Sequence, residues 1–276
     1  MRWGLGLTRA AYAIGRQELG SVLTSPMPYV WLSAALALAV FVLDSHLDTI
    51  DGLGLGVYAD PLIYPIALAG LILGLYLALS ASTTITRERE AGTLEVLFWT
   101  PTSDADLVLG KVLANVVVAA VLAAAVTALL ILGALVTGVA SRGDLPLAAL
   151  ALLGFLAAMA ALGLLLSALA KRVRAAVVIL TGIVVLFLSL RVAATVLAAL
   201  PPEQLSGPML LLRDGLLVVS AAAGVASPVQ HFVWALEALQ AQDLSAYLKA
   251  GGASIFGLGV SVGLSVLALK LRGVRP

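Results

Sequence analysis

Long apolar runs separated by short polar segments make up most of the chain. A helix needs about 20 apolar residues to cross the hydrocarbon core of a membrane. We identify six such runs, of which the first is short, at about residues 29–43, 61–84, 112–139, 145–170, 175–200 and 253–271. The pattern therefore predicts six transmembrane helices.

The segment that precedes the first run, residues 1–28, has a helical pattern of its own. Its basic residues repeat every seven positions and its apolar residues lie on roughly the opposite side: Arg2, Arg9 and Arg16 against Trp3, Leu7 and Ile14. This layout is typical of an amphipathic helix that lies on a membrane surface, and we expect one over residues 2–24. A loosely ordered basic tail is the alternative.

The segment between the fifth and sixth runs, residues 201–252, is too long for a simple turn. Its first half is apolar but is interrupted by Arg213 and Asp214, which favours a re-entrant or interfacial element over a seventh span. In the second half, one helical face carries Phe232, Val233, Leu236 and Leu239. This face predicts a second interfacial helix, on the outer side of the membrane.

A dense polar segment, residues 87–103, follows the second run and starts with Arg87, Glu88, Arg89 and Glu90. The pattern predicts a short helix over about 87–99, with a bend at Gly92. One face of this helix carries Leu94, Leu97 and Phe98, and Thr100-Pro101 ends it. Ser103 and Asp106 then have the spacing of a cap for the third span. A solvated loop that merely reverses the chain is the alternative.

Composition strengthens the membrane interpretation. Of the 276 residues, 62% are hydrophobic and 11% are charged, against roughly 25% charged in a soluble protein. We therefore predict an all-α polytopic membrane protein, a single transmembrane domain. The absence of cysteine excludes disulfides and thiolate chemistry. The net charge of +1 argues against a nucleic-acid partner.

Basic residues occur in alternate loops. The N-terminal segment, residues 87–111, residues 171–174 and the C-terminal tail each carry three of them: Arg2, Arg9, Arg16; Arg87, Arg89, Lys111; Lys171, Arg172, Arg174; Lys270, Arg272, Arg275. The loop after the first run has Asp44, Asp48, Asp51 and Asp60 and no basic residue. Cytoplasmic loops carry the excess of Lys and Arg, so we expect both termini and the polar segment in the cytoplasm. A cleaved signal peptide ending near "ALALA" is the alternative for the first run.

Motifs for chemistry are few. No phosphate-binding loop of the form G-x-x-x-x-G-K-[ST] occurs, so the chain does not hydrolyse ATP by itself. No metal-binding cluster is visible. Gly259-x-Ser261-x-Gly263 matches a serine-nucleophile pattern, but it lies inside a span, and His46 and His231 both fall in outer loops. The same glycines, like Gly70 and Gly74, have the spacing of close helix packing.

Arg191 is the one charge well inside a predicted span. It either marks a substrate path or extends toward the outer interface, and we favour the second interpretation. No span carries an acidic residue at mid-membrane, which gives no support to ion-coupled transport. The apolar spans mildly favour a lipidic, apolar or peptide-like cargo over a small ion.

The polar segment resembles the signature of type-2 permeases of ATP-binding-cassette (ABC) exporters. The motif E-x-E-x-G-T-L-E-x-L…T-P, followed by G-K, matches at Glu88, Glu90, Gly92, Thr93, Leu94, Glu95, Leu97, Thr100, Pro101, Gly110 and Lys111. The segments "RQELGSVLTSPMPYVWL" and "SPVQHFVWAL" are similar to the branch that contains gliding-motility and nitrous-oxide-reductase accessory permeases. The resemblance covers essentially the whole chain.

This resemblance implies a prokaryotic plasma-membrane exporter subunit that works with a separate ATPase, two permeases to two ATPases. ATP and magnesium would be bound by the ATPase, and this chain would bind no cofactor. Residues 87–100 match the coupling helix that transmits ATPase movement, although Phe98-Trp99 is bulkier than usual. The other hypotheses are an intramembrane serine hydrolase that uses Ser261 and an ATP-independent scaffold or channel.

Overall fold

The computed structural model describes residues 6–53, 61–93, 103–137, 143–201 and 206–271. Within those ranges the chain is helical throughout and forms no strand. The helices are α1 (Gly6–Thr24), α2 (Met27–Leu53), α3 (Ile63–Glu90), α5 (Asp104–Thr137), α6 (Leu145–Leu169), α7 (Val173–Ala199), α8 (Gly207–Ala226), α9 (Pro228–Gln240) and α10 (Leu244–Leu271).

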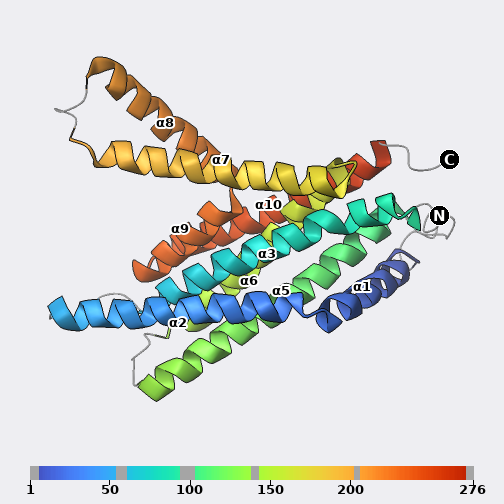
Figure 1. The fold of residues 1–276 in the computed structure, drawn as a ribbon, viewed down its shortest axis with the longest axis horizontal. Coiled ribbons are helices and arrows are strands. Elements are labelled where there is room, and N and C mark those ends of the chain that lie inside the picture. Colours follow the sequence, from blue (N-terminus) through green and yellow to red (C-terminus); the bar gives the residue numbers. More distant parts are fainter. Residues whose placement is uncertain (1–5, 54–60, 94–102, 138–142, 202–205, 272–276) are drawn as a thin grey trace.

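Most of the long helices run between the same two ends of the molecule (Figure 1). The start of α1, the end of α3, the α6–α7 junction and the end of α10 lie at one end, which we call the basic end because Arg87, Arg172 and Lys270 lie there. The alternation of basic segments in the sequence therefore corresponds to a grouping in space.

The helices α8 and α9 form a hairpin at the end opposite the basic end. In Figure 1, α8 leads from that end back toward the middle of the molecule, and α9 returns to the same end before α10 begins. Seven described helices are long and apolar enough to cross a membrane: α2, α3, α5, α6, α7, α8 and α10. The helix α8 thus adds one to the six runs predicted from the sequence.

Several helices are longer than predicted. The helix α2 continues to Leu53, so Asp44, Asp48 and Asp51 lie on a helix and not in a loop. No proline or glycine interrupts residues 29–51, and the helix ends at the glycine-rich stretch that begins at Gly52. The helix α10 starts at Leu244, nine residues before the predicted boundary at 253. The preceding Asp243 stabilises this start, because its carboxylate accepts hydrogen bonds from the Ser245 and Ala246 amides at 2.9 and 3.0 Å.

The helices α3 and α6 form the centre of the bundle. Their apolar windows are 56% and 61% buried, more than those of the other long helices. A Cβ placed on Gly163 of α6 would lie 2.3 Å from the carbonyl oxygen of Ala78 of α3, so these two backbones are in direct contact. The two central helices therefore approach each other more closely than ordinary side chains allow.

The apolar face of α9 packs into this centre. Phe232, Leu236 and Leu239 are buried, and the Phe232 ring stacks on Phe155 of α6 with centroids 4.5 Å apart. Protein rather than lipid therefore covers these three residues, and the interfacial position of α9 stays a prediction. An apolar face has the same sequence pattern whether lipid or protein covers it.

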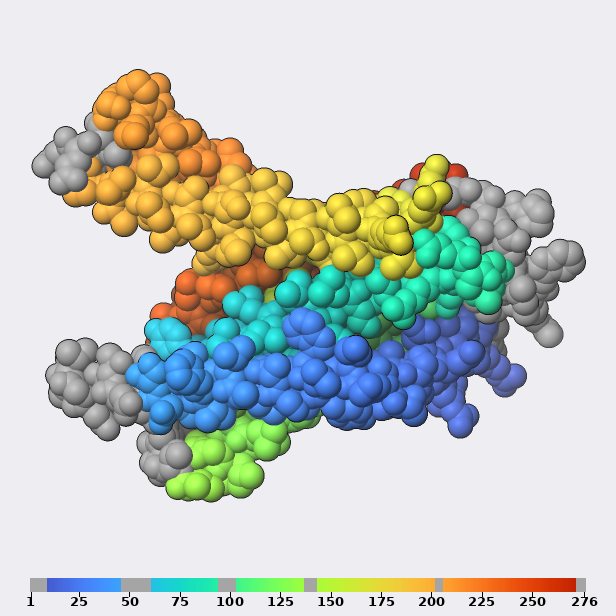
Figure 2. Space-filling view, viewed as in Figure 1, coloured from blue at the N-terminus to red at the C-terminus, as the bar shows by residue number. Residues whose placement is uncertain are grey.

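The helices α7 and α8 project from the rest of the molecule at the end away from the basic end, and Figure 2 shows open space between them and α2 and α3. Only 11% of the apolar window of α7 and 6% of that of α8 are buried. Their exposed side chains are largely aliphatic, for example Val178, Leu186 and Leu211. Such surfaces suit a hydrocarbon environment.

Candidate functional site

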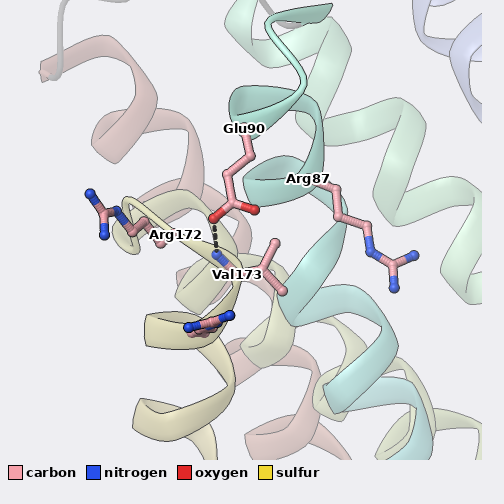
Figure 3. Close-up of a pocket in the computed structure, with 5 residues that line it drawn as sticks. Arg87, Glu90, Arg172 and Val173 are labelled. Atoms are coloured by element: carbon pink, nitrogen blue, oxygen red, sulfur yellow. Dashed lines mark hydrogen bonds between the residues drawn. The ribbon is translucent and has the colours of Figure 1, made fainter.

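Three polar residues at the end of α3, Glu88, Arg89 and Glu90, each contact a different part of the bundle. Glu90 reaches across to α7, where its Oε1 atom accepts a hydrogen bond from the backbone amide of Val173 at 2.9 Å (Figure 3). Val173 is the first residue of α7, and the preceding Arg172 makes no side-chain cap. Glu90 therefore caps α7 from another helix and places a negative charge at the positive end of the helix dipole.

Arg89 contacts the other side of the same junction. Its Nη1 atom donates a hydrogen bond to the carbonyl oxygen of Ala170, the residue that caps the C-terminus of α6. A cation at the C-terminus of a helix is favourable because the last carbonyl groups carry partial negative charge. Arg89 and Glu90 together hold the α6–α7 junction against the end of α3.

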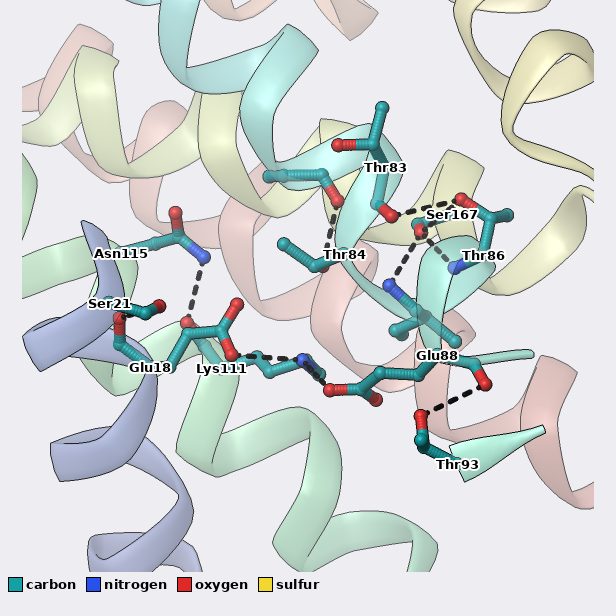
Figure 4. A network of polar contacts seen from close by, with 12 residues as sticks. Glu18, Ser21, Thr83, Thr84, Thr86, Glu88, Thr93, Lys111, Asn115 and Ser167 are labelled. Atoms are coloured by element: carbon teal, nitrogen blue, oxygen red, sulfur yellow. Dashed lines mark hydrogen bonds and ion pairs between the residues drawn. The ribbon is translucent and has the colours of Figure 1, made fainter. Parts of the chain in front are cut away.

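Glu88 reaches in a third direction, into a buried ion cluster (Figure 4). Its Oε1 atom lies 2.7 Å from the Nζ atom of Lys111 of α5, and Oε2 of Glu18 of α1 lies 3.3 Å from the same nitrogen. The Lys111 side chain is 1% exposed, whereas those of Glu18 and Glu88 are 21% and 26% exposed. One ammonium group thus joins α1, α3 and α5.

A pair of glycines makes this ion cluster possible. The helices α1 and α5 cross at Gly15 and Gly110, where an added Cβ would lie 2.9 Å from the Gly110 carbonyl oxygen and 2.7 Å from that of Ala11, respectively. Larger residues would hold the two helices apart and move Glu18 away from Lys111. Gly110 and Lys111 therefore serve the same contact: the glycine lets α1 and α5 approach, and the lysine pairs with Glu18 across the crossing.

The burial of Lys111 corrects the sequence prediction, which assigned this residue to a cytoplasmic loop. The helix α5 starts at Asp104 because Ser103 and Asp106 form a capping box. The Ser103 hydroxyl accepts from the Asp106 amide at 3.1 Å, and the Asp106 carboxylate accepts from the Ser103 amide at 3.0 Å. The predicted cap is therefore confirmed, and it places Lys111 inside the helix.

A serine that the sequence reasoning missed anchors the last part of α3. The Ser167 hydroxyl of α6 is buried and accepts hydrogen bonds from the amides of Ile85 and Thr86 at 3.0 and 3.1 Å. Ser167 follows Gly163 by four residues, a spacing of small residues that is typical of closely packed membrane helices. That spacing was the signal in the sequence.

The first residues of the polar segment belong to α3. Arg87, Glu88 and Glu90 form the last turn of α3 rather than the start of a separate helix. The apolar second span and the polar segment therefore share one uninterrupted helix up to Glu90.

The chain turns immediately after that helix. Gly92 has a φ of +69°, which permits the predicted bend, and the Thr93 hydroxyl donates to the Glu88 carbonyl oxygen at 3.2 Å. The remaining predicted residues lie outside the described part of the chain: Leu94, Glu95, Leu97, Phe98, Thr100 and Pro101.

Arg191 lies far from this cluster, on the exposed side of α7. Its Nη1 atom donates a hydrogen bond to the Oε1 atom of Gln230, near the start of α9. His231, the next residue, is buried, and its Nε2 atom lies 2.9 Å from the carbonyl oxygen of Val225. The polar side chains of α7 and α9 thus hold the turn between α8 and α9.

Ser261 and the predicted packing glycines have different surroundings. Ser261 lies within the continuous helix α10, whereas a nucleophile of the predicted type needs a strand-to-helix turn. A Cβ on Gly70 or Gly74 would meet Phe232 or Phe155 at 2.8 or 2.6 Å. No atom of another described helix lies within 4 Å of such a Cβ at Gly259 or Gly263, so these two glycines make no close packing contact with the described helices.

Comparison with known proteins places these features in a family. A family profile described as "ABC-2 family transporter protein" matches residues 13–271. The matched region includes every residue of the ion cluster and the whole α3–α7 junction. A comparison with curated proteins found no match.

Proposed function

Since the chain belongs to the ABC-2 family of transporter proteins, we propose that it is the membrane-spanning subunit of an ABC exporter driven by a separate ATPase. In this proposal α2, α3, α5, α6, α7 and α10 are the six spans, and the α8–α9 hairpin re-enters from the outer side. The basic end faces the cytoplasm of a prokaryotic cell, as the positive charges favour.

One observation carries the proposal: the last turn of α3 is linked to four other helices. Glu88 binds Lys111 of α5 and, through it, Glu18 of α1, while Arg89 and Glu90 hold the ends of α6 and α7. A displacement of the chain that follows Glu90 would therefore act on α1, α5, α6 and α7 together. This is the arrangement that a coupling element requires, because packed helices move as discrete bodies.

The ATPase would contact residues 87–100. We propose that the apolar side chains Leu94, Leu97 and Phe98 sit in a groove of the ATPase, and that Glu95 and the turn at Gly92, Thr93 and Pro101 set the orientation of the contact. Arg87, Glu88 and Glu90, in the last turn of α3, connect this segment to the bundle. Interface charges of this kind contribute more to orientation and association rate than to affinity. The partner would bind ATP and magnesium, and two copies of each chain would form the complex.

Co-purification tests this proposal. The tagged chain, solubilised from its native membrane, is expected to retain a subunit that carries a phosphate-binding loop, and Leu94→Asp is expected to release it. Leu244→Asp is the matched control, because Leu244 is 59% exposed at the end opposite the basic end. The proposal fails if no ATP-binding subunit is retained, or if both variants retain it equally.

A further inference from the structure

An open, positively charged pocket of about 580 Å³ lies between the end of α3 and the start of α7 (Figure 3). Its lining consists of Arg87, Glu90, Arg172, Val173 and Arg174. None of the three arginines forms an ion pair with a carboxylate of the described residues. The one acidic residue of the lining, Glu90, already accepts a hydrogen bond from the Val173 amide. The pocket thus has an excess of positive charge.

The arginine side chains are exposed and lie around the pocket without converging on one point. In Figure 3, Arg87 and Arg172 extend to opposite sides of Glu90. Arginine side chains on a surface change rotamer readily, and their planar guanidinium groups match the geometry of phosphate. The lining therefore suits the binding of a phosphate group from another molecule rather than an ion pair within the protein.

The surface next to the pocket identifies the rest of the ligand. Arg174, Val178 and Val185 lie on one face of α7, since they are spaced at i, i+4 and i+11. Val178 is 69% exposed and Val185 is 55% exposed. This apolar face extends about 16 Å from Arg174, at 1.5 Å per residue, which is about half of the hydrocarbon thickness of a bilayer.

We infer that the α3–α7 pocket binds an anionic phospholipid, with its phosphate among Arg87, Arg172 and Arg174 and an acyl chain along Val178 and Val185. Basic pockets between membrane helices are typical sites for such headgroups. The inference requires that α7 spans the membrane, and it does not require an ATPase. It rests on the proposed function only in assigning the lipid to the cytoplasmic leaflet, so the two proposals fail separately.

Native mass spectrometry of the purified full chain, titrated with phosphatidylglycerol or phosphatidylcholine, tests the inference. Phosphatidylglycerol should bind more tightly and saturably. Each of Arg172→Gln and Arg174→Gln should weaken it about fivefold, and the double variant about 25-fold. The double variant with lysines at both positions should keep most of the binding, because it keeps the charge. Lys171→Gln is the matched control, because Lys171 precedes Arg172 but does not line the pocket.

Four outcomes overturn the inference. Equal binding of the two lipids would exclude recognition of the anionic headgroup, and an equal loss in Lys171→Gln would indicate attraction to general surface charge. Displacement of phosphatidylglycerol by inorganic phosphate at comparable concentration would assign the pocket to a free anion. If lipid binding depends on the arginines only when the ATPase subunit is added, the pocket is a site for a protein partner.

Discussion

The Nζ atom of Lys111 lies 2.7 Å from Oε1 of Glu88, and the Lys111 side chain is almost fully buried. Its second carboxylate partner, Glu18, lies at 3.3 Å on a different helix. A buried ammonium group is costly unless it is paired, and the Oε2 atom of Glu88 is also buried without a hydrogen-bond partner among the described residues, whereas Glu18 has no such atom. The cost of breaking this cluster therefore depends strongly on which member is removed.

The ion cluster predicts a suppressor relationship. Glu18→Gln combined with Glu88→Gln leaves Lys111 buried without a negative partner, and we expect a loss of about 3 kcal/mol in the free energy of unfolding. Adding Lys111→Met, which removes the charge at similar volume, should restore most of that loss. The measurement is unfolding of the purified chain by titration with a denaturing detergent.

The single variant Lys111→Met serves as the reference for this cycle. It should cost about 3 kcal/mol, because it leaves the Glu88 carboxylate, whose Oε2 atom is buried without a hydrogen-bond partner among the described residues, with no positive partner. If Lys111→Met destabilises the double variant further, the cluster is not an ion-paired unit and the interpretation is wrong.

Gly163→Ala is expected to separate α3 and α6. The new Cβ would lie 2.3 Å from the backbone oxygen of Ala78, an atom that cannot move away without the helix. We expect a loss of about 1–3 kcal/mol in unfolding free energy. Gly154→Ala on the same helix has no described atom of another helix within 4 Å of its Cβ and should be neutral or slightly stabilising. Equal effects of the two variants would contradict the close contact.

Ser167→Ala tests the hydrogen bonds that hold the end of α3. It removes a buried acceptor used by the amides of Ile85 and Thr86, and should cost about 1–2 kcal/mol. Ser265 is equally buried, but its hydroxyl donates only to the Ser261 carbonyl of its own helix. Ser265→Ala should therefore cost less than about 0.5 kcal/mol, and a reversed order would refute the anchoring role.

The α8–α9 hairpin predicts a labelling pattern. The chain has no cysteine, so Ser206→Cys, Ser227→Cys and Ala241→Cys can be made singly in the natural sequence. In intact cells an impermeant thiol reagent should label the positions at Ser206 and Ala241, which flank the hairpin, and not Ser227 at its turn. The position at Ala91→Cys should be labelled only after permeabilisation. Labelling of Ser227→Cys from the cytoplasmic side would make α8 a complete span.

The sequence predicted the parts of the fold that have a one-dimensional signal. The fourth span, predicted at 145–170, is α6 at Leu145–Leu169, because a basic segment follows it and Pro146 suits the first turn. The second span was predicted to end at 84, whereas α3 continues through the charged residues to Glu90. The change from apolar to charged residues marks the end of the apolar run, but not the end of the helix.

The parts that could not be predicted depend on which helices are neighbours. The charge rule assigns a lysine near a span to the cytoplasm, so it could not place Lys111 in the interior. Its burial requires the crossing of α1 and α5 at Gly15 and Gly110. Likewise, the apolar face of α9 would have the same sequence pattern against lipid or against protein. Only the packing of Phe232 on Phe155 shows that protein covers it.

The most direct test of the central claim, that an ATPase acts on the chain at the end of α3, is site-specific photo-crosslinking in the native membrane. Thr93 is exposed just after Glu90, and Ser206 is exposed at the opposite end of the molecule. With benzoylphenylalanine in place of Thr93, we expect a crosslink to a subunit that carries a phosphate-binding loop, and none with the same residue in place of Ser206. A crosslink to such a subunit from position 206, or from neither position, would contradict the account.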